Sequence, residues 1–163
     1  MIDVSVYMIT YFHQDYIEQA IQSVFSQKTK YSYEIVISDD GSTDGTMDVL
    51  RRYEKKYPKL VRVYHHEKNL GIPKNIFFAR TQCRGKYIVA LSGDDYWIDN
   101  EKIEKQVDFL ENHPEYVGVC NGMELRYDND SIPYNILPPT KERDRKFTLH
   151  NYERGETLYT HGL

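Results

Sequence analysis

The chain has 163 residues, of which 40% are hydrophobic and 13% aromatic, so one domain with a real core is expected and a disordered chain is excluded. Its 21 basic and 25 acidic side chains give a formal net charge of −4, which disfavours nucleic-acid binding. Two cysteines are too few for a secreted disulfide framework, and no apolar run approaches the roughly 20 residues of a membrane span, so we expect a cytoplasmic protein.

The first half of the chain alternates between strand and helix patterns. Residues 4–10 form a β-branched and aromatic run that predicts a strand, and the apolar spacing over 16–25 predicts an amphipathic helix. A second strand is expected at 34–38, where an Asp-Asp-Gly sequence ends the run. The next helix runs to about residue 57, and Ser42 and Thr43 are both residue types that can cap it.

The same alternation continues in the second half. A strand at 60–64 is followed by a helix over 73–83, which has a proline in its first turn and a glycine just after its end. A strand at 86–91, a helix over 100–113 and a fifth strand at 116–124 complete the series. Four strand–helix alternations predict an α/β fold with a mostly parallel sheet and helices on both faces.

The composition changes after residue 126, where prolines and a run of mixed charges replace the alternating pattern. We therefore divide the chain into a domain at 1–126 and a long connection at 127–163.

Acidic residues follow two of the predicted strands. Parallel strands bring their carboxyl ends to one edge of a sheet, and ligands of open α/β sheets bind there. One Asp-Asp-Gly alone is more often a strand-ending turn, but two acidic pairs at two strand ends favour a ligand site. Clustered carboxylates recruit a hard cation such as Mg²⁺ or Mn²⁺, which completes its shell with water and phosphate oxygens. The four acids are Asp39, Asp40, Asp94 and Asp95.

Several short motifs occur in one order along the chain. They are the run 4–11, Ala20-Ile21-Gln22-Ser23-Val24, Asp39-Asp40-Gly41-Ser42-Thr43-Asp44-Gly45-Thr46, Asn69-Leu70-Gly71, Gly85-Lys86-Tyr87-Ile88 and Gly93-Asp94-Asp95-Tyr96-Trp97. Together they resemble glycosyltransferase family 2, over residues 2–119. The last motif resembles that of bacterial enzymes of surface-polysaccharide assembly. The resemblance implies a Rossmann-like nucleotide-diphospho-sugar transferase (GT-A) fold, with donor binding in 1–126 and the start of an incomplete acceptor-side segment in 127–163.

The resemblance also implies how a nucleotide is held. Asp39 matches the acid that accepts the N3–H of the base, usually uracil, and Asp40 caps the following turn or helps with the base. Thr10 and Tyr11 line the base and ribose pocket. A carboxylate only accepts hydrogen bonds, so it rejects cytosine, whose N3 is an acceptor, but it does not exclude guanine.

A second set of residues is expected to bind the metal and the diphosphate. One of the acids Asp94 and Asp95, with Asp95 favoured, is expected to ligate Mg²⁺ or Mn²⁺, and the other is expected to meet the ribose or a metal-bound water. Lys74 lies where it could reach the diphosphate, although a solvated lysine at a helix start is an equally good interpretation. Ser92 stands where relatives more often have another acid, which reduces the number of expected metal ligands.

The implied activity is metal-dependent, inverting transfer of a sugar from a nucleotide-diphospho-sugar, with UDP favoured, to a hydroxyl of a glycan or lipid-linked acceptor. This transfer requires a general base, which we expect beyond Leu163, because nothing ties Glu153 or Glu156 to that role. Peripheral association with the inner face of the membrane is expected through a segment outside the chain.

Two other functions compete with this interpretation. A non-catalytic module that binds nucleotide-sugars would explain the lack of an assigned base. A nucleotidyltransferase would also place acids at strand ends, but the Thr10-Tyr11-Phe12-His13 sequence is unlike a glycine-rich phosphate loop.

Overall fold

The computed structural model describes residues 1–125, 135–137, 146–148, 151 and 153–154. It divides the chain into two compact units, Met1–Val117 and Gly118–Leu163. The boundary predicted at 126/127 lies outside the described residues.

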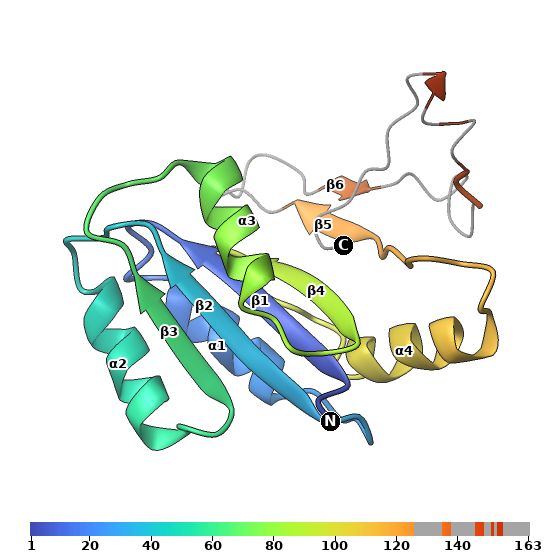
Figure 1. The fold of residues 1–163 in the computed structure, drawn as a ribbon, viewed down its shortest axis with the longest axis horizontal. Coiled ribbons are helices and arrows are strands. Elements are labelled where there is room, and N and C mark those ends of the chain that lie inside the picture. The colour runs from blue at the N-terminus through green and yellow to red at the C-terminus, as the bar shows by residue number, and fades with distance from the viewer. Residues whose placement is uncertain (126–134, 138–145, 149–150, 152, 155–163) are drawn as a thin grey trace. The chain divides into compact units, whose positions relative to one another are not determined.

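The first unit is built on a four-stranded parallel sheet. Its strands are β1 (Val4–Thr10), β2 (Tyr33–Asp39), β3 (Val61–His65) and β4 (Tyr87–Ser92), in the order β3-β2-β1-β4 (Figure 1). In the register of β1, Thr10 pairs with Asp39 and Ile9 with Ser92. The carboxyl ends of β1, β2 and β4 therefore meet at one edge, with β1 in the middle.

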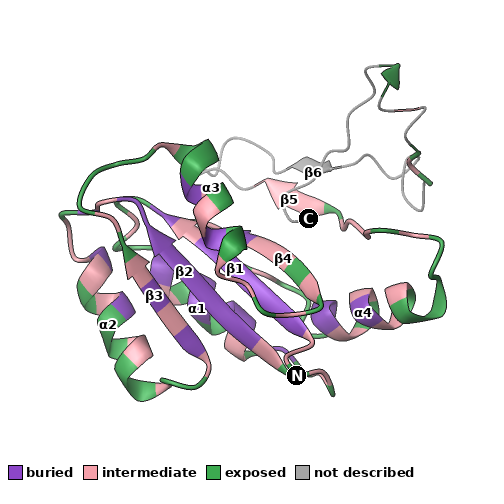
Figure 2. Ribbon diagram, viewed as in Figure 1, coloured by how far each residue is buried: buried purple, intermediate pink, exposed green. Residues whose placement is uncertain are grey.

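Helices cover both faces of this sheet. The helices α1 (Ile17–Phe25), α2 (Thr46–Lys56) and α4 (Lys102–Asn112) share one apolar cluster with the sheet. On the opposite face, α3 (Ile72–Thr81) packs Ala79 against Tyr7 and Val36. Alternate residues of the central strands face the two clusters, so β1 and β2 are buried along most of their length (Figure 2). The predicted α/β fold with helices on both faces is confirmed.

The start of α2 differs from the prediction. Neither Ser42 nor Thr43 caps this helix, which begins at Thr46 after Gly45. The hydroxyl of Ser42 instead donates to Asp39 Oδ1 at 2.5 Å and accepts a bond from the Phe12 N–H at 2.9 Å. The Ser42 hydroxyl therefore holds the loop after β2 together, and α2 begins about one turn later than predicted.

The fifth predicted strand is also different in the structure. Residues 117–122 are not in a strand, and the second unit holds the short antiparallel pair β5 (Met123–Leu125) and β6 (Asn135–Leu137). Gly118 and Gly122 interrupt the predicted run, and glycine weakens a strand interior. In the part of the chain that the structure describes, no helix is long and apolar enough to cross a bilayer.

A buried polar network holds the loop between α3 and β4 against the sheet. Glu34 is 3% exposed and pairs with Arg62, with Oε2 and Nη2 2.9 Å apart. Its Oε1 accepts bonds from the Ser5 hydroxyl at 2.7 Å and from the Arg84 N–H at 2.9 Å. The Gly85 N–H donates to the same Ser5 hydroxyl at 2.8 Å.

Candidate functional site

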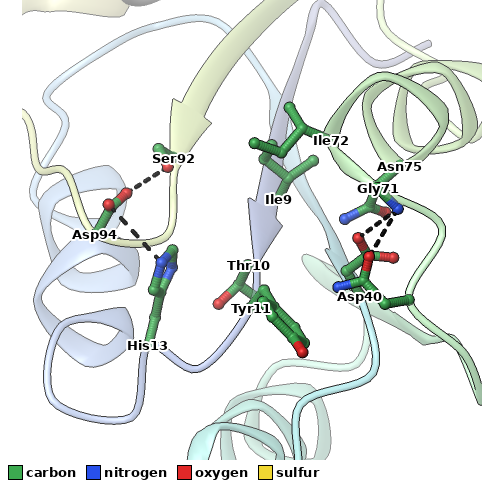
Figure 3. A pocket seen from close by; sticks show the side chains of 11 residues that line it. Ile9, Thr10, Tyr11, His13, Asp40, Gly71, Ile72, Asn75, Ser92 and Asp94 are labelled. Atoms are coloured by element: carbon green, nitrogen blue, oxygen red, sulfur yellow. Dashed lines mark hydrogen bonds and ion pairs between the residues drawn. The ribbon is translucent and has the colours of Figure 1, made fainter.

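A pocket of about 290 Å³ opens at the carboxyl ends of β1, β2 and β4. It is lined by Ile9, Thr10, Tyr11, His13, Asp40, Asn69, Gly71, Ile72, Asn75, Ser92 and Asp94. Figure 3 shows Asp40, Gly71 and Asn75 on one side and His13, Ser92 and Asp94 on the other. The pocket therefore has two chemically distinct ends, which we call the Asp40 end and the Asp94 end.

At the Asp40 end, backbone groups fix a nearly buried carboxylate. Asp40 is 4% exposed, and its two oxygens accept bonds from the N–H groups of Leu70 at 2.7 Å and Gly71 at 3.1 Å. Its own N–H donates to the Thr10 carbonyl at 2.9 Å. Gly71 has φ +81°, a conformation that glycine adopts without strain. Each oxygen keeps a second lone pair, so this carboxylate can still accept a bond from a ligand.

Asp39 has a different environment, because its carboxylate is used within the protein. The side chain is fully buried, and its Oδ2 accepts bonds from the N–H groups of Gly41 at 3.2 Å and Ser42 at 2.9 Å. The same oxygen lies 2.8 Å from Nδ1 of His65. Asp39 is not among the residues that line the pocket. Its visible role is to hold the loop that carries Asp40.

This loop also shapes the segment after β1. Ser42, which Asp39 holds, accepts the Phe12 N–H, and the His13 N–H donates to Thr46 Oγ1 at 3.0 Å. Phe12 has φ +56°, a left-handed conformation that is uncommon outside glycine, asparagine and aspartate. The hydrogen bonds at both ends hold this turn in place, and it leaves Tyr11 at the pocket wall.

At the Asp94 end, two buried polar atoms have no partner. They are Thr10 Oγ1 and His13 Nδ1, for which the described part of the chain offers no hydrogen-bond partner. Both surround Gly93, because a Cβ added there would lie 2.9 Å from the first atom and 2.8 Å from the second. The Ser92 hydroxyl donates to Asp94 Oδ1, and Asp94 Oδ2 lies 3.8 Å from His13 Nε2. Gly93 therefore lies in close contact with two polar atoms, beside an exposed carboxylate.

The donor set at this end fits a hard divalent cation only in part. Asp94 lies at the pocket wall, and Asp95 follows it, half-buried and outside the lining. No group of three or more histidine, cysteine, aspartate or glutamate side chains is placed to hold a metal among the described residues. One or two carboxylates are nevertheless what Mg²⁺ usually takes from a protein when phosphates and water supply the remaining oxygens. The two acids fit such a shared site, in which the ligand completes the coordination.

The structure brings together four of the six residues expected to bind the nucleotide. Thr10, Tyr11, Asp40 and Asp94 line the pocket, whereas Asp39 lies behind it. Lys74 is exposed in the first turn of α3 and is not part of the lining.

The two glutamates considered as alternative bases lie in the second unit. Glu153 is exposed, and Glu156 lies outside the described residues.

Sequence reasoning did not find the histidines and the asparagine of this site. His65 and His66 lie at the end of β3, and both contact residues of β2, the first Asp39 and the second Ser38. Asn75 lines the pocket and is 2% exposed. Their position in the sequence was the one available signal, since both histidines lie at the carboxyl end of a predicted strand, where ligands of parallel sheets bind.

The model of glycosyl transferase family 2 matches residues 5–162. The chain belongs to this family. With the parallel sheet described above, this defines the GT-A fold, and a mannosyltransferase from Pyrobaculum calidifontis shares that fold at 24% identity and a TM-score of 0.60.

Two curated relatives are putative glycosyltransferases of Bacillus subtilis. The putative teichuronic acid biosynthesis glycosyltransferase TuaG of Bacillus subtilis is 39% identical over 107 residues, which are 66% of this chain and 41% of that protein. The putative glycosyltransferase EpsE of the same organism is 32% identical over 140 residues, 85% of this chain and 49% of that protein. The chain thus spans less than half of these relatives.

Among solved structures, the chain is similar to Staphylococcus aureus TarS. A structure of TarS residues 1–349 with UDP is 31% identical, with a TM-score of 0.62, over 69% of this chain and 33% of that one. The corresponding complex with UDP-GlcNAc has a TM-score of 0.61 and 30% identity.

Proposed function

We propose that this chain is the donor-binding part of a metal-dependent, inverting glycosyltransferase that uses a UDP-sugar. The observation that carries the proposal is the two-ended pocket, with a fixed carboxylate at one end and an acidic loop at the other. The complexes of TarS with UDP and UDP-GlcNAc, at 30–31% identity, support the choice of nucleotide. The proposed acceptor is a hydroxyl of a glycan or lipid-linked sugar, in keeping with the teichuronic acid biosynthesis named for TuaG.

The uracil base of the nucleotide is assigned to the Asp40 end of the pocket. Asp40 offers a carboxylate that is held by two backbone N–H groups and lines the pocket, whereas the carboxylate of Asp39 is occupied behind it. We therefore assign the contact with uracil N3–H to Asp40 in place of Asp39. The exposed ring of Tyr11 lies at the same wall and can pack on the base or ribose.

The diphosphate is assigned to the Asp94 end. Asp94 and Asp95 would hold the divalent cation, and the unpartnered Thr10 hydroxyl and His13 imidazole would bond to phosphate oxygens or bound water. When bound, such a cation stabilises negative charge on the departing diphosphate. Lys74 is exposed in the first turn of α3, and its proposed role is to bring a positive charge to the diphosphate.

Transfer also needs a group that removes the proton of the acceptor hydroxyl, which attacks the anomeric carbon opposite the leaving group. Of the described residues that line the pocket, only Asp40 and Asp94 carry carboxylates, and both have other roles in this proposal. The general base that takes the acceptor proton is therefore proposed to come from outside the pocket lining.

We expect the chain to bind UDP in a metal-dependent way. The measurement is a calorimetric titration of UDP in the presence of Mn²⁺, repeated with excess chelator. A ligand at 100 times its Kd adds about 2.7 kcal/mol to the free energy of unfolding, so thermal unfolding provides a second readout. Equal affinity in both titrations would remove the metal from the proposal, and no binding of any nucleotide would overturn the function.

The close contact at Gly93 gives a second test. We expect Gly93→Ala to weaken metal-supported UDP binding about tenfold or more, because its Cβ would lie 2.8 Å from both Thr10 Cβ and His13 Nδ1. Such crowding displaces the acidic loop and lowers the free energy of unfolding by about 1–3 kcal/mol.

Gly45→Ala is the control for this variant, since the atoms nearest to its Cβ belong to the Gln14 side chain, beginning at 3.1 Å. Unchanged UDP affinity in Gly93→Ala, with the fold intact, would show that the close contact at Gly93 does not contribute to the ligand site.

A further inference from the structure

A chain of hydrogen bonds leads from the end of β3 into the pocket. His66 Nε2 lies 3.0 Å from the Ser38 hydroxyl, and this hydroxyl donates to Asn75 Oδ1 at 2.5 Å. The Asn75 amide then donates through Nδ2 to the Ser38 carbonyl at 3.1 Å. Ser38 is fully buried and Asn75 is 2% exposed. These three residues form what we call the Asn75 relay.

The relay fixes the direction of every bond in it. The Ser38 hydroxyl has one hydrogen, which it gives to Asn75, so His66 Nε2 must be the donor to Ser38. The amide of Asn75 cannot be turned over, because its oxygen would then face the carbonyl oxygen of Ser38. The His66 ring also packs edge-on to Phe78, with ring centroids 4.6 Å apart.

The relay leaves one amide hydrogen of Asn75 for the pocket. Nδ2 carries two hydrogens, of which Ser38 takes one, and the other has no acceptor among the residues that the structure describes. A buried donor without a partner is unfavourable, and here the donor belongs to a residue that lines the pocket.

Asn75 lies close to Asp40 in the hydrogen-bonding pattern. The Asn75 N–H donates to the Gly71 carbonyl at 3.0 Å, and the Gly71 N–H donates to Asp40 Oδ2 at 3.1 Å. Figure 3 shows these three residues on the same side of the pocket.

We propose that Asn75 is a specificity-determining residue that donates a hydrogen bond to the base carbonyl next to the N–H accepted by Asp40. In this proposal, which rests on the proposed function, Ser38 and His66 are positioning residues. An acceptor beside a donor matches the edge of uracil, where N3–H neighbours a carbonyl. Guanine presents the same order, whereas cytosine and adenine present an amino group beside an acceptor nitrogen.

The first test replaces the amide and measures Kd for two nucleotides. We expect Asn75→Ala to weaken UDP binding about three- to tenfold, the range for one neutral hydrogen bond, and to leave CDP binding in competition assays unchanged. The UDP preference of the protein therefore falls. An equal loss for both nucleotides would place Asn75 on the ribose or phosphates, and no loss for either would remove it from the site. Either result overturns the proposal.

The second test isolates the relay. His66→Leu removes the donor to Ser38, and we expect it to weaken UDP binding about two- to fivefold, while His66→Gln, which keeps an N–H donor, restores most of the affinity. In the Asn75→Ala background, His66→Leu should have no further effect on UDP. Additive losses in the double variant would show that His66 acts independently of Asn75 and would overturn the relay.

Thermal unfolding of each variant identifies the fraction that is folded, and all titrations use the full 163-residue chain with Mn²⁺ present. If the wild-type chain binds no nucleotide, the proposed function fails. If it binds UDP and the variants keep the wild-type ratio of UDP to CDP affinity, only the role of Asn75 fails.

Discussion

We expect Gly85→Ala to lower the free energy of unfolding by about 3 kcal/mol or more, the upper part of the range for overpacking. A Cβ at this position would lie 2.4 Å from the Ser5 backbone nitrogen and 2.7 Å from the Val4 carbonyl carbon. Both atoms belong to β1, the central strand, so neither can move without disturbing the sheet. Thermal unfolding should show a Tm lower by roughly 6–12 °C for a chain of this size.

The buried network around Glu34 adds to this effect. The Gly85 N–H and the Arg84 N–H both donate to the Ser5 hydroxyl, at 2.8 and 3.0 Å, so a shifted loop leaves buried polar groups unpaired. Gly45→Ala again serves as the matched control and is expected to stay close to the wild-type Tm. A Gly85→Ala variant with wild-type Tm would mean that the loop can move away from β1 at little cost.

We expect Asp40→Asn to weaken UDP binding by about 1.5–3 kcal/mol, which is roughly 10- to 150-fold in Kd. The substitution keeps the shape of the side chain but replaces a charged acceptor with an amide. One of its two contacts to the N–H groups of Leu70 and Gly71 is retained, so the loop should stay in place. Calorimetric titration with UDP and Mn²⁺ gives the affinity.

Asp39→Asn is the informative comparison, because the family resemblance of the sequence assigns the contact with the uracil base to Asp39. Its carboxylate accepts bonds from two backbone N–H groups and the Ser42 hydroxyl, so we expect a loss of stability of about 2 kcal/mol or more. UDP affinity, measured well below the Tm, should fall less than in Asp40→Asn. The opposite order, with a larger UDP loss in Asp39→Asn, would return the base contact to Asp39.

The fold was predictable where local pattern and tertiary burial agree. The run at 4–10 is a strand on both criteria, and β1 has the predicted bounds. The pattern at 116–124 misled because a β-branched run says nothing about a partner strand, and only Met123–Leu125 is paired. Helix starts were less accurate, since Ser42 bonds to Asp39 and Phe12 instead of capping α2.

The site was predictable at the level of strand ends but not of single side chains. Alternation of strands and helices was enough to bring Asp40 and Asp94 to one pocket. It could not decide which of the adjacent residues Asp39 and Asp40 faces the ligand, because that depends on which carboxylate the Gly41 and Ser42 N–H groups capture. The role of Asn75 depends on Ser38, 37 positions away, a contact that no local pattern encodes.

The order of the strands also sets the distance between the two ends of the pocket. Asp40 follows β2 and Asp94 follows β4, with β1 between them, so two strand spacings, roughly 10 Å in all, separate the strands that carry the two ends. Loops can adjust the tips, but backbone hydrogen bonds hold the strands at that spacing. A ligand that engages both ends must have a matching length between the two groups that contact them. Selection by length is then a property of the sheet itself, and it would persist when any one lining side chain is replaced.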